Sequence, residues 1–183
     1  MSLAWIPMST ETVGEVLTAE AINNMITNIA TLGACPRCAA YLGTAGSTTA
    51  GTDTAVPFDT YPDDQAGSGI VASLGTDCYF VVPYTGWYQV CGQMKVTGAT
   101  DGGQITLSIA INSEGTFTAL LSGGATQTFE AQPVGVVVAG LVYLTSGQGI
   151  SLVYLTTDSL AFDIDPSNNF MTAHLVGQSA AYP

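Results

Sequence analysis

A two-residue alternation of apolar and polar side chains constrains this chain more than any other feature. In residues 88–96 the members Tyr88, Val90, Gly92, Met94 and Val96 alternate with Gln89, Cys91, Gln93 and Lys95. The run Ile105, Leu107, Ile109 and Ile111 repeats the pattern. Successive side chains of a β-strand point to opposite faces, so this period is typical of strands with one buried face. We therefore predict an all-β domain.

Other runs extend the strand pattern. Residues 134–144 and 150–155 are apolar on both faces, which is expected at the centre of a sheet or at a subunit interface. Further strands are predicted between Gly-, Asp-, Ser- and Pro-rich turns, at residues 37–42, 54–58, 69–74, 77–82, 116–121, 126–131 and 169–177. About ten short strands with this spacing favour a sandwich of two packed sheets, such as a jelly roll.

A short helix is predicted ahead of the strands, at residues 18–32. Thr18 is its N-cap and Gly33 its C-terminal stop. Its apolar residues recur at steps of three and four, as in the seam of a coiled coil, and are Ile22, Met25, Ile26, Ile29 and Leu32. A helix of this length is not stable alone in water. We expect this stripe to pack on partner helices or another docking surface, the alternative being the chain's own β domain.

The charges of the chain are few and almost all negative. Charged residues make up 9% of the sequence, hydrophobic residues make up 47%, and 14 acids stand against Arg37 and Lys95 for a net charge of −12. Such a surface repels phosphate groups and anionic lipid, so neither nucleic acid nor membrane is an expected partner. With so few ions, the surface must be built from neutral polar residues or be covered by other copies.

Neither a membrane span nor an export signal is expected. The apolar run at residues 134–144 is about half as long as the roughly 20 residues that cross a bilayer. Residues 1–10 lack the basic and apolar regions of a signal peptide. We expect a product made in the cytoplasm that acts elsewhere after cell lysis.

Residues that could perform catalysis are sparse, and we expect neither an enzyme nor a cofactor. A Ser-His-Asp arrangement would depend on His174, the only histidine. His174 falls in an alternating strand that shares one face with Phe170, Thr172 and Val176. A structural role is therefore favoured for it.

The cysteines leave several arrangements open. Cys35 and Cys38 have C-x-x-C spacing, for which a local disulfide or two plain thiols is favoured over zinc ligation. Cys78 and Cys91 lie in strand-like runs, where they are buried thiols or form a cross-strand disulfide.

Two groups of loop acids could supply oxygen ligands to calcium. One is Asp158, Asp163 and Asp165, and the other is Asp63 with Asp64. Short acidic groups in loops are usually only solvated, and no metal is assigned to them.

Four landmarks occur in a particular order along residues 35–178. They are FVVPYTGWY at residues 80–88, Ile109-Ala110-Ile111-Asn112, LTSGQGISL at residues 144–152, and a closing segment from Asn169 to Gly177. In these landmarks the chain resembles the C1q and tumour-necrosis-factor-like jelly-roll superfamily, in particular its versions in bacteriophage virions and actinobacterial prophages. The resemblance implies a jelly roll over residues 35–183 and a homotrimer.

The front of the chain carries a second resemblance. Residues 14–19, GEVLTA, with Asn23 and Asn24, are similar to the W-x-x-G-E-x-x-T-A-x-x-L-N start of many phage tail and virion proteins. Trp5 stands nine positions before Gly14, whereas the pattern has three. The resemblance implies that residues 1–34 dock in a particle, with Trp5 and the helix stripe as docking residues.

Together these features predict a structural virion protein located on the particle. It would be a trimeric capsid decoration or head fibre, or a minor tail or tail-tip protein. Its expected partners are other virion proteins, bound through the N-terminal segment, and a host-surface glycan. The alternative is a free C1q-like module that binds carbohydrate or protein outside any particle. A hydrolytic β-sandwich, which would depend on His174, is the least favoured interpretation.

Overall fold

The computed structural model describes residues 36–61, 71–75, 78–98, 102–113, 115–126, 132–163, 165 and 167–177. The chain divides after Cys35 into two units, and all of these residues belong to the second. The predicted helix at residues 18–32 and the docking residues Trp5, Ile22, Met25, Ile26, Ile29 and Leu32 lie outside the described residues, as do Cys35, Asp63 and Asp64. In the described ranges no helix is long and apolar enough to cross a membrane.

The described part of the chain contains eleven strands and confirms the all-β prediction. They are β1 (Arg37–Tyr41), β2 (Thr54–Ala55), β3 (Val71–Ser73), β4 (Tyr79–Val81), β5 (Gly86–Thr97), β6 (Gln104–Ser113), β7 (Thr116–Thr126), β8 (Val134–Leu144), β9 (Gly149–Thr156), β10 (Ala161–Phe162) and β11 (Phe170–Gly177). The predicted strand at residues 134–144 has the observed bounds of β8.

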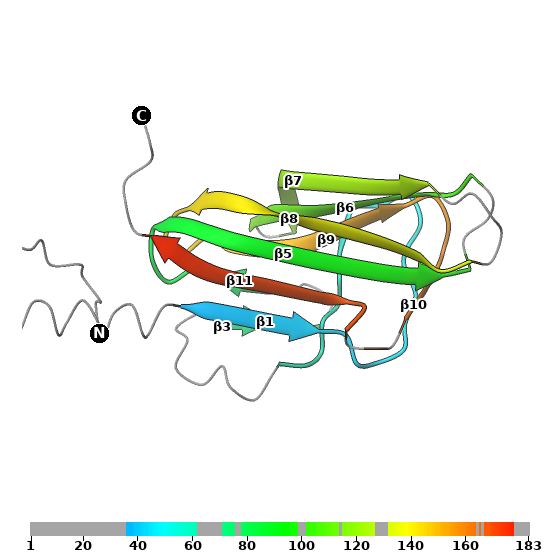
Figure 1. The fold of residues 1–183 in the computed structure, drawn as a ribbon, viewed down its shortest axis with the longest axis horizontal. Coiled ribbons are helices and arrows are strands. Elements are labelled where there is room, and N and C mark those ends of the chain that lie inside the picture. Colours follow the sequence, from blue (N-terminus) through cyan, green and yellow to red (C-terminus); the bar gives the residue numbers. More distant parts are fainter. Residues whose placement is uncertain are drawn as a thin grey trace, which may run out of the picture. The chain divides into compact units, whose positions relative to one another are not determined.

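The strands form two antiparallel sheets. Sheet A runs β1-β11-β5-β8, with β10 beside the end of β5. Sheet B runs β3-β4-β9-β6-β7, and β2 also pairs with β9. Figure 1 shows sheet A in front of β6 and β9 of sheet B. The first and last strands of the domain are neighbours, and β5 lies between β11 and β8, as in a jelly roll.

The core lies between the two sheets and is built by the predicted alternation. Along β5, buried and half-buried residues alternate from Gly86 to Thr97. Fully buried large side chains come from both sheets, among them Tyr88, Met94, Leu107, Ile109, Leu152 and Met171. Full burial of one such aliphatic or aromatic side chain stabilises the fold by about 1.5–3 kcal/mol.

The two strands that are apolar on both faces have different environments. β9 lies between β4 and β6, and both of its faces are largely buried. β8 pairs with β5 at one side of sheet A, and its residues alternate between buried and exposed or half-buried. Val137 and Leu141 of β8 remain 56% and 50% exposed. The position of β9 between two strands therefore explains why both of its faces are apolar. In β8, by contrast, one apolar face points away from the core.

One predicted strand break is wrong. Residues 116–121 and 126–131 were expected to be separate strands, but β7 continues from Thr116 to Thr126. Gly123 and Gly124, which lie between the two predicted strands, both stay in the ladder with β6. A Cβ on Gly123 would lie 3.1 Å from the carbonyl oxygen of Val137. The glycine thus allows β7 of sheet B to approach the backbone of β8 in sheet A.

We expect Gly92→Ala to lower the free energy of unfolding by about 1–3 kcal/mol, because an added methyl group strains a packed core. Gly92 is buried in β5, and a Cβ there would overlap the side chain of Leu152. Gly135→Ala in β8 is the matched control, since a Cβ at Gly135 has no neighbour within 4 Å. Urea denaturation measures both variants. Equal stabilities would contradict the packing of Gly92 against Leu152.

Candidate interaction surface

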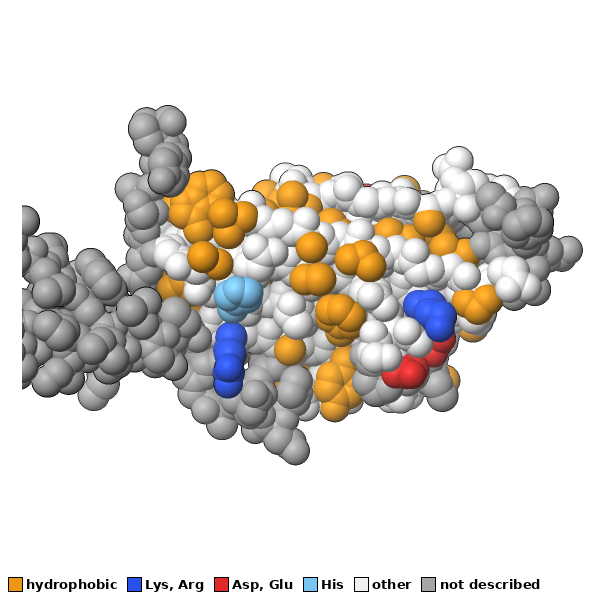
Figure 2. Space-filling view, viewed as in Figure 1, with side chains coloured by type: hydrophobic (Ala, Val, Ile, Leu, Met, Phe, Trp, Pro, Cys, Tyr) orange, Lys and Arg blue, Asp and Glu red, His pale blue; other side chains and the backbone are white. Residues whose placement is uncertain are grey.

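The side of sheet A that faces away from the core carries many apolar and aromatic side chains. We call it the outer face of sheet A. Its residues follow from the alternation of burial along each strand and are Arg37, Ala39, Tyr41, Phe170, Thr172, His174, Val176, Trp87, Gln89, Cys91, Gln93, Lys95, Gly135, Val137, Ala139, Leu141 and Tyr143. Figure 2 shows orange apolar groups distributed over this side of the molecule.

The register of the strands aligns these side chains in rows. One row runs across all four strands and consists of Tyr41, Phe170, Gln93 and Val137. Near the end where β11 finishes, Trp87 of β5 lies opposite Tyr143 of β8, with ring centroids 5.4 Å apart in an edge-to-face arrangement. Val176, next to this pair along β11, is 57% exposed. Apolar groups therefore project from every strand of the sheet.

Charge is distributed unevenly between strands and loops. None of the eleven described strands contains Asp or Glu, although the chain has 14 acids. The two bases of the whole chain, Arg37 and Lys95, both lie on the outer face of sheet A together with the only histidine. In Figure 2 the blue and pale blue groups share this face, and red acidic groups occur at one corner.

The outward side of sheet B is mainly polar on β6 and β7, although Leu155 of β9 is 40% exposed there. Its exposed positions on β6 and β7 include Gln104, Thr106, Thr126 and Ser122. The hydroxyl groups of Ser108 and Ser122 are 2.8 Å apart and hydrogen-bonded. Neutral hydroxyl groups are readily solvated, whereas apolar and aromatic groups gain free energy by being covered. The outer face of sheet A is therefore the candidate interaction surface.

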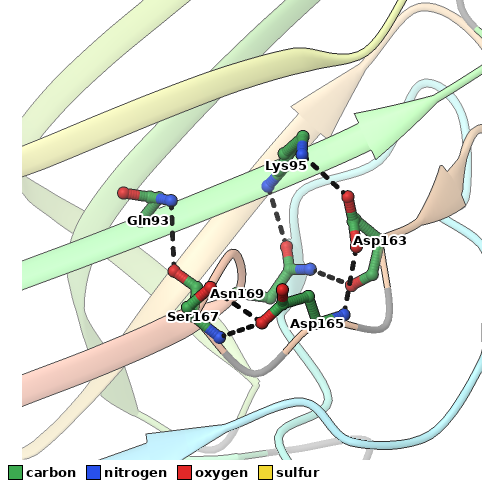
Figure 3. Close-up of polar contacts among 6 residues, drawn as sticks. All are labelled: Gln93, Lys95, Asp163, Asp165, Ser167 and Asn169. Atoms are coloured by element: carbon green, nitrogen blue, oxygen red, sulfur yellow. Dashed lines mark hydrogen bonds and ion pairs between the residues drawn. The ribbon is translucent and has the colours of Figure 1, made fainter.

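The corner of this face near Lys95 is a closed polar network (Figure 3). The Lys95 ammonium forms an ion pair with the Asp163 carboxylate at 2.9 Å. Asn169 is fully buried, and its side-chain oxygen accepts the backbone N–H of Lys95 at 2.8 Å, while its amide donates to the Asp163 carbonyl. The pKa of Asp163 is lowered by the backbone N–H of Asp165 and by Lys95. The network fastens the loop before β11 to β5.

The structure does not bring Asp158, Asp163 and Asp165 together as calcium ligands, so that hypothesis is not supported. Asp163 is already neutralised by Lys95, and Asp165 accepts the hydroxyl and N–H of Ser167 at 2.7 and 2.9 Å. These two hydrogen bonds lower the pKa of Asp165. Among the residues that the structure describes, no group of three or more His, Cys, Asp or Glu side chains could hold a metal ion.

The described cysteines are free thiols. Cys38 and Cys78 are buried in the core, and burial raises the pKa of each thiol to about 12, with the neighbouring Cys78 also raising that of Cys38. Cys91 lies on the outer face of sheet A, on the opposite side of the sheet from the core. The cross-strand disulfide between Cys78 and Cys91 is therefore absent, and zinc ligation by these thiols is not supported.

His174 is exposed on β11 and shares its face with Phe170, Thr172 and Val176, as predicted. Its cross-strand neighbours are Arg37 on β1 and Gln89 on β5. A triad needs a nucleophile and an orienting carboxylate in contact with the imidazole. Neither cross-strand neighbour can fill these roles, so this position does not resemble a hydrolytic site.

Two antiparallel sheets in this order define a jelly roll of the tumour-necrosis-factor-like kind, which confirms the predicted fold class. Among the solved structures that match is that of "Eiger TNF from S. frugiperda", with a TM-score of 0.65 and 13% sequence identity over 80% of this chain and 96% of that chain. At this identity the likeness concerns the fold. No protein family matches the sequence, and a comparison with curated proteins finds no match.

We expect Asn169→Ala to destabilise the domain by about 1–3 kcal/mol, because it leaves the Lys95 N–H and the Asp163 carbonyl without their partner. Ser167→Ala is the matched control in the same loop, since Ser167 is exposed, and we expect a loss below about 0.5 kcal/mol. Chemical denaturation at neutral pH measures both. Similar losses in the two variants would contradict the central position of Asn169 in the network.

Proposed function

We propose that this protein is a non-enzymatic homotrimer whose chains pack through the outer face of sheet A, and that it projects from the surface of a bacteriophage virion. The apolar and aromatic character of that face, in a chain with a net charge of −12, is the observation that carries the proposal. Within the particle the protein would be a capsid decoration or head fibre, or a minor tail or tail-tip protein.

The exposed side chains support self-association. Val137, Leu141 and Val176 are each at least half exposed, and covering such a side chain contributes about 1 kcal/mol per chain. Because the described strands carry no acids, chains that meet through this face bring no strand carboxylates against one another, and Asp163 at its corner is paired with Lys95. The number of copies, three, is taken from the likeness to C1q and tumour-necrosis-factor-like jelly rolls.

The position of the domain's two ends supports a docked, projecting arrangement. Arg37 at the start of β1 pairs with His174 near the end of β11, and the N–H of Leu175 donates to the Pro36 carbonyl at 2.8 Å. The polypeptide therefore enters and leaves the sandwich at one end. A docking segment at residues 1–34 would attach there, bound to other virion proteins, and the opposite end would be free to contact a host-surface glycan.

A free binding module is the second candidate function. The likeness to the Eiger TNF favours it, because that protein is a TNF with the same fold. In this case residues 1–34 would have no particle to dock in, and the β domain alone would bind carbohydrate or protein. Both candidates share the homotrimer and differ in the role of the N-terminal segment.

We expect Leu141→Asp to convert the trimer into single chains without unfolding them. Leu141 is half exposed on the outer face of sheet A, and covering an unpaired carboxylate is unfavourable. Thr106→Asp is the matched control, because it places the same charge at an exposed position of sheet B. Sedimentation velocity gives the mass and circular dichroism the folded state. A trimeric Leu141→Asp variant would exclude this face as the interface.

We expect Ile26→Asp to abolish incorporation into particles while the β domain still forms trimers. The substitution places a charge in the predicted docking stripe, which lies outside the β domain. Thr27→Asp, on the polar side of the predicted helix, is the control. Incorporation is measured by complementing a deletion phage and analysing purified particles. Normal incorporation of the Ile26→Asp variant would contradict the docking role of the segment. In a separate experiment residues 1–33 are removed, and a truncated chain that still binds glycan or protein would favour the free module.

A further inference from the structure

We draw no further inference here: the strongest candidate, the outer edge of β7 at the end of sheet B, whose 11 residues carry no charge and which among the described strands pairs with β6 alone, carries nothing because nothing in the structure shows what covers that edge.

Discussion

Each strand of sheet A has two faces, and the sandwich can bury only one of them. The inward residues of β5, β8 and β11 fill the core, which leaves Trp87, Val137, Leu141 and Val176 on the side that sheet B cannot reach. None of the described strands contains an acid, so the 14 acids of the chain lie in its other segments. Chains of strongly negative net charge can then approach through strands that carry no acid, and the Asp163 carboxylate at the corner of this face is paired with Lys95.

The small number of charged residues also affects how the loops of the domain are held. Lys95, one of two bases in the whole chain, is held by Asp163 in a network completed by the buried Asn169. An ammonium group thus neutralises a carboxylate that the sequence alone presented as a candidate calcium ligand. Elsewhere, close approach is achieved by small residues, as where Gly123 of β7 lies against the backbone of β8. Close packing at small residues and local hydrogen-bond networks thus both hold the described strands together.

The two-residue alternation in the sequence predicts much of the fold. Which apolar strand faces remain exposed depends instead on the order of the strands in the sheets, which the alternation does not give. The alternation in residues 88–96 and the apolar run at residues 134–144 predicted β5 and β8, because side-chain direction within a strand is a local property. The sequence could not separate the buried β9 from the outward-facing β8, since both are apolar and only their neighbours in the sheets differ. The strand break predicted between residues 121 and 126 is wrong for a similar reason, because the strand that Gly123 approaches is distant in sequence.

The neighbouring positions of the first and last strands have a mechanical consequence. β1 is a short strand held to β11 by an antiparallel ladder whose hydrogen bonds run across the strand axis. Tension between the segment before Arg37 and the far end of the sandwich runs along β1 and strains all of those bonds in shear at once. Tension between the two chain ends would instead open the ladder bond by bond from its Arg37 end. The direction of the load thus determines how much force the domain withstands.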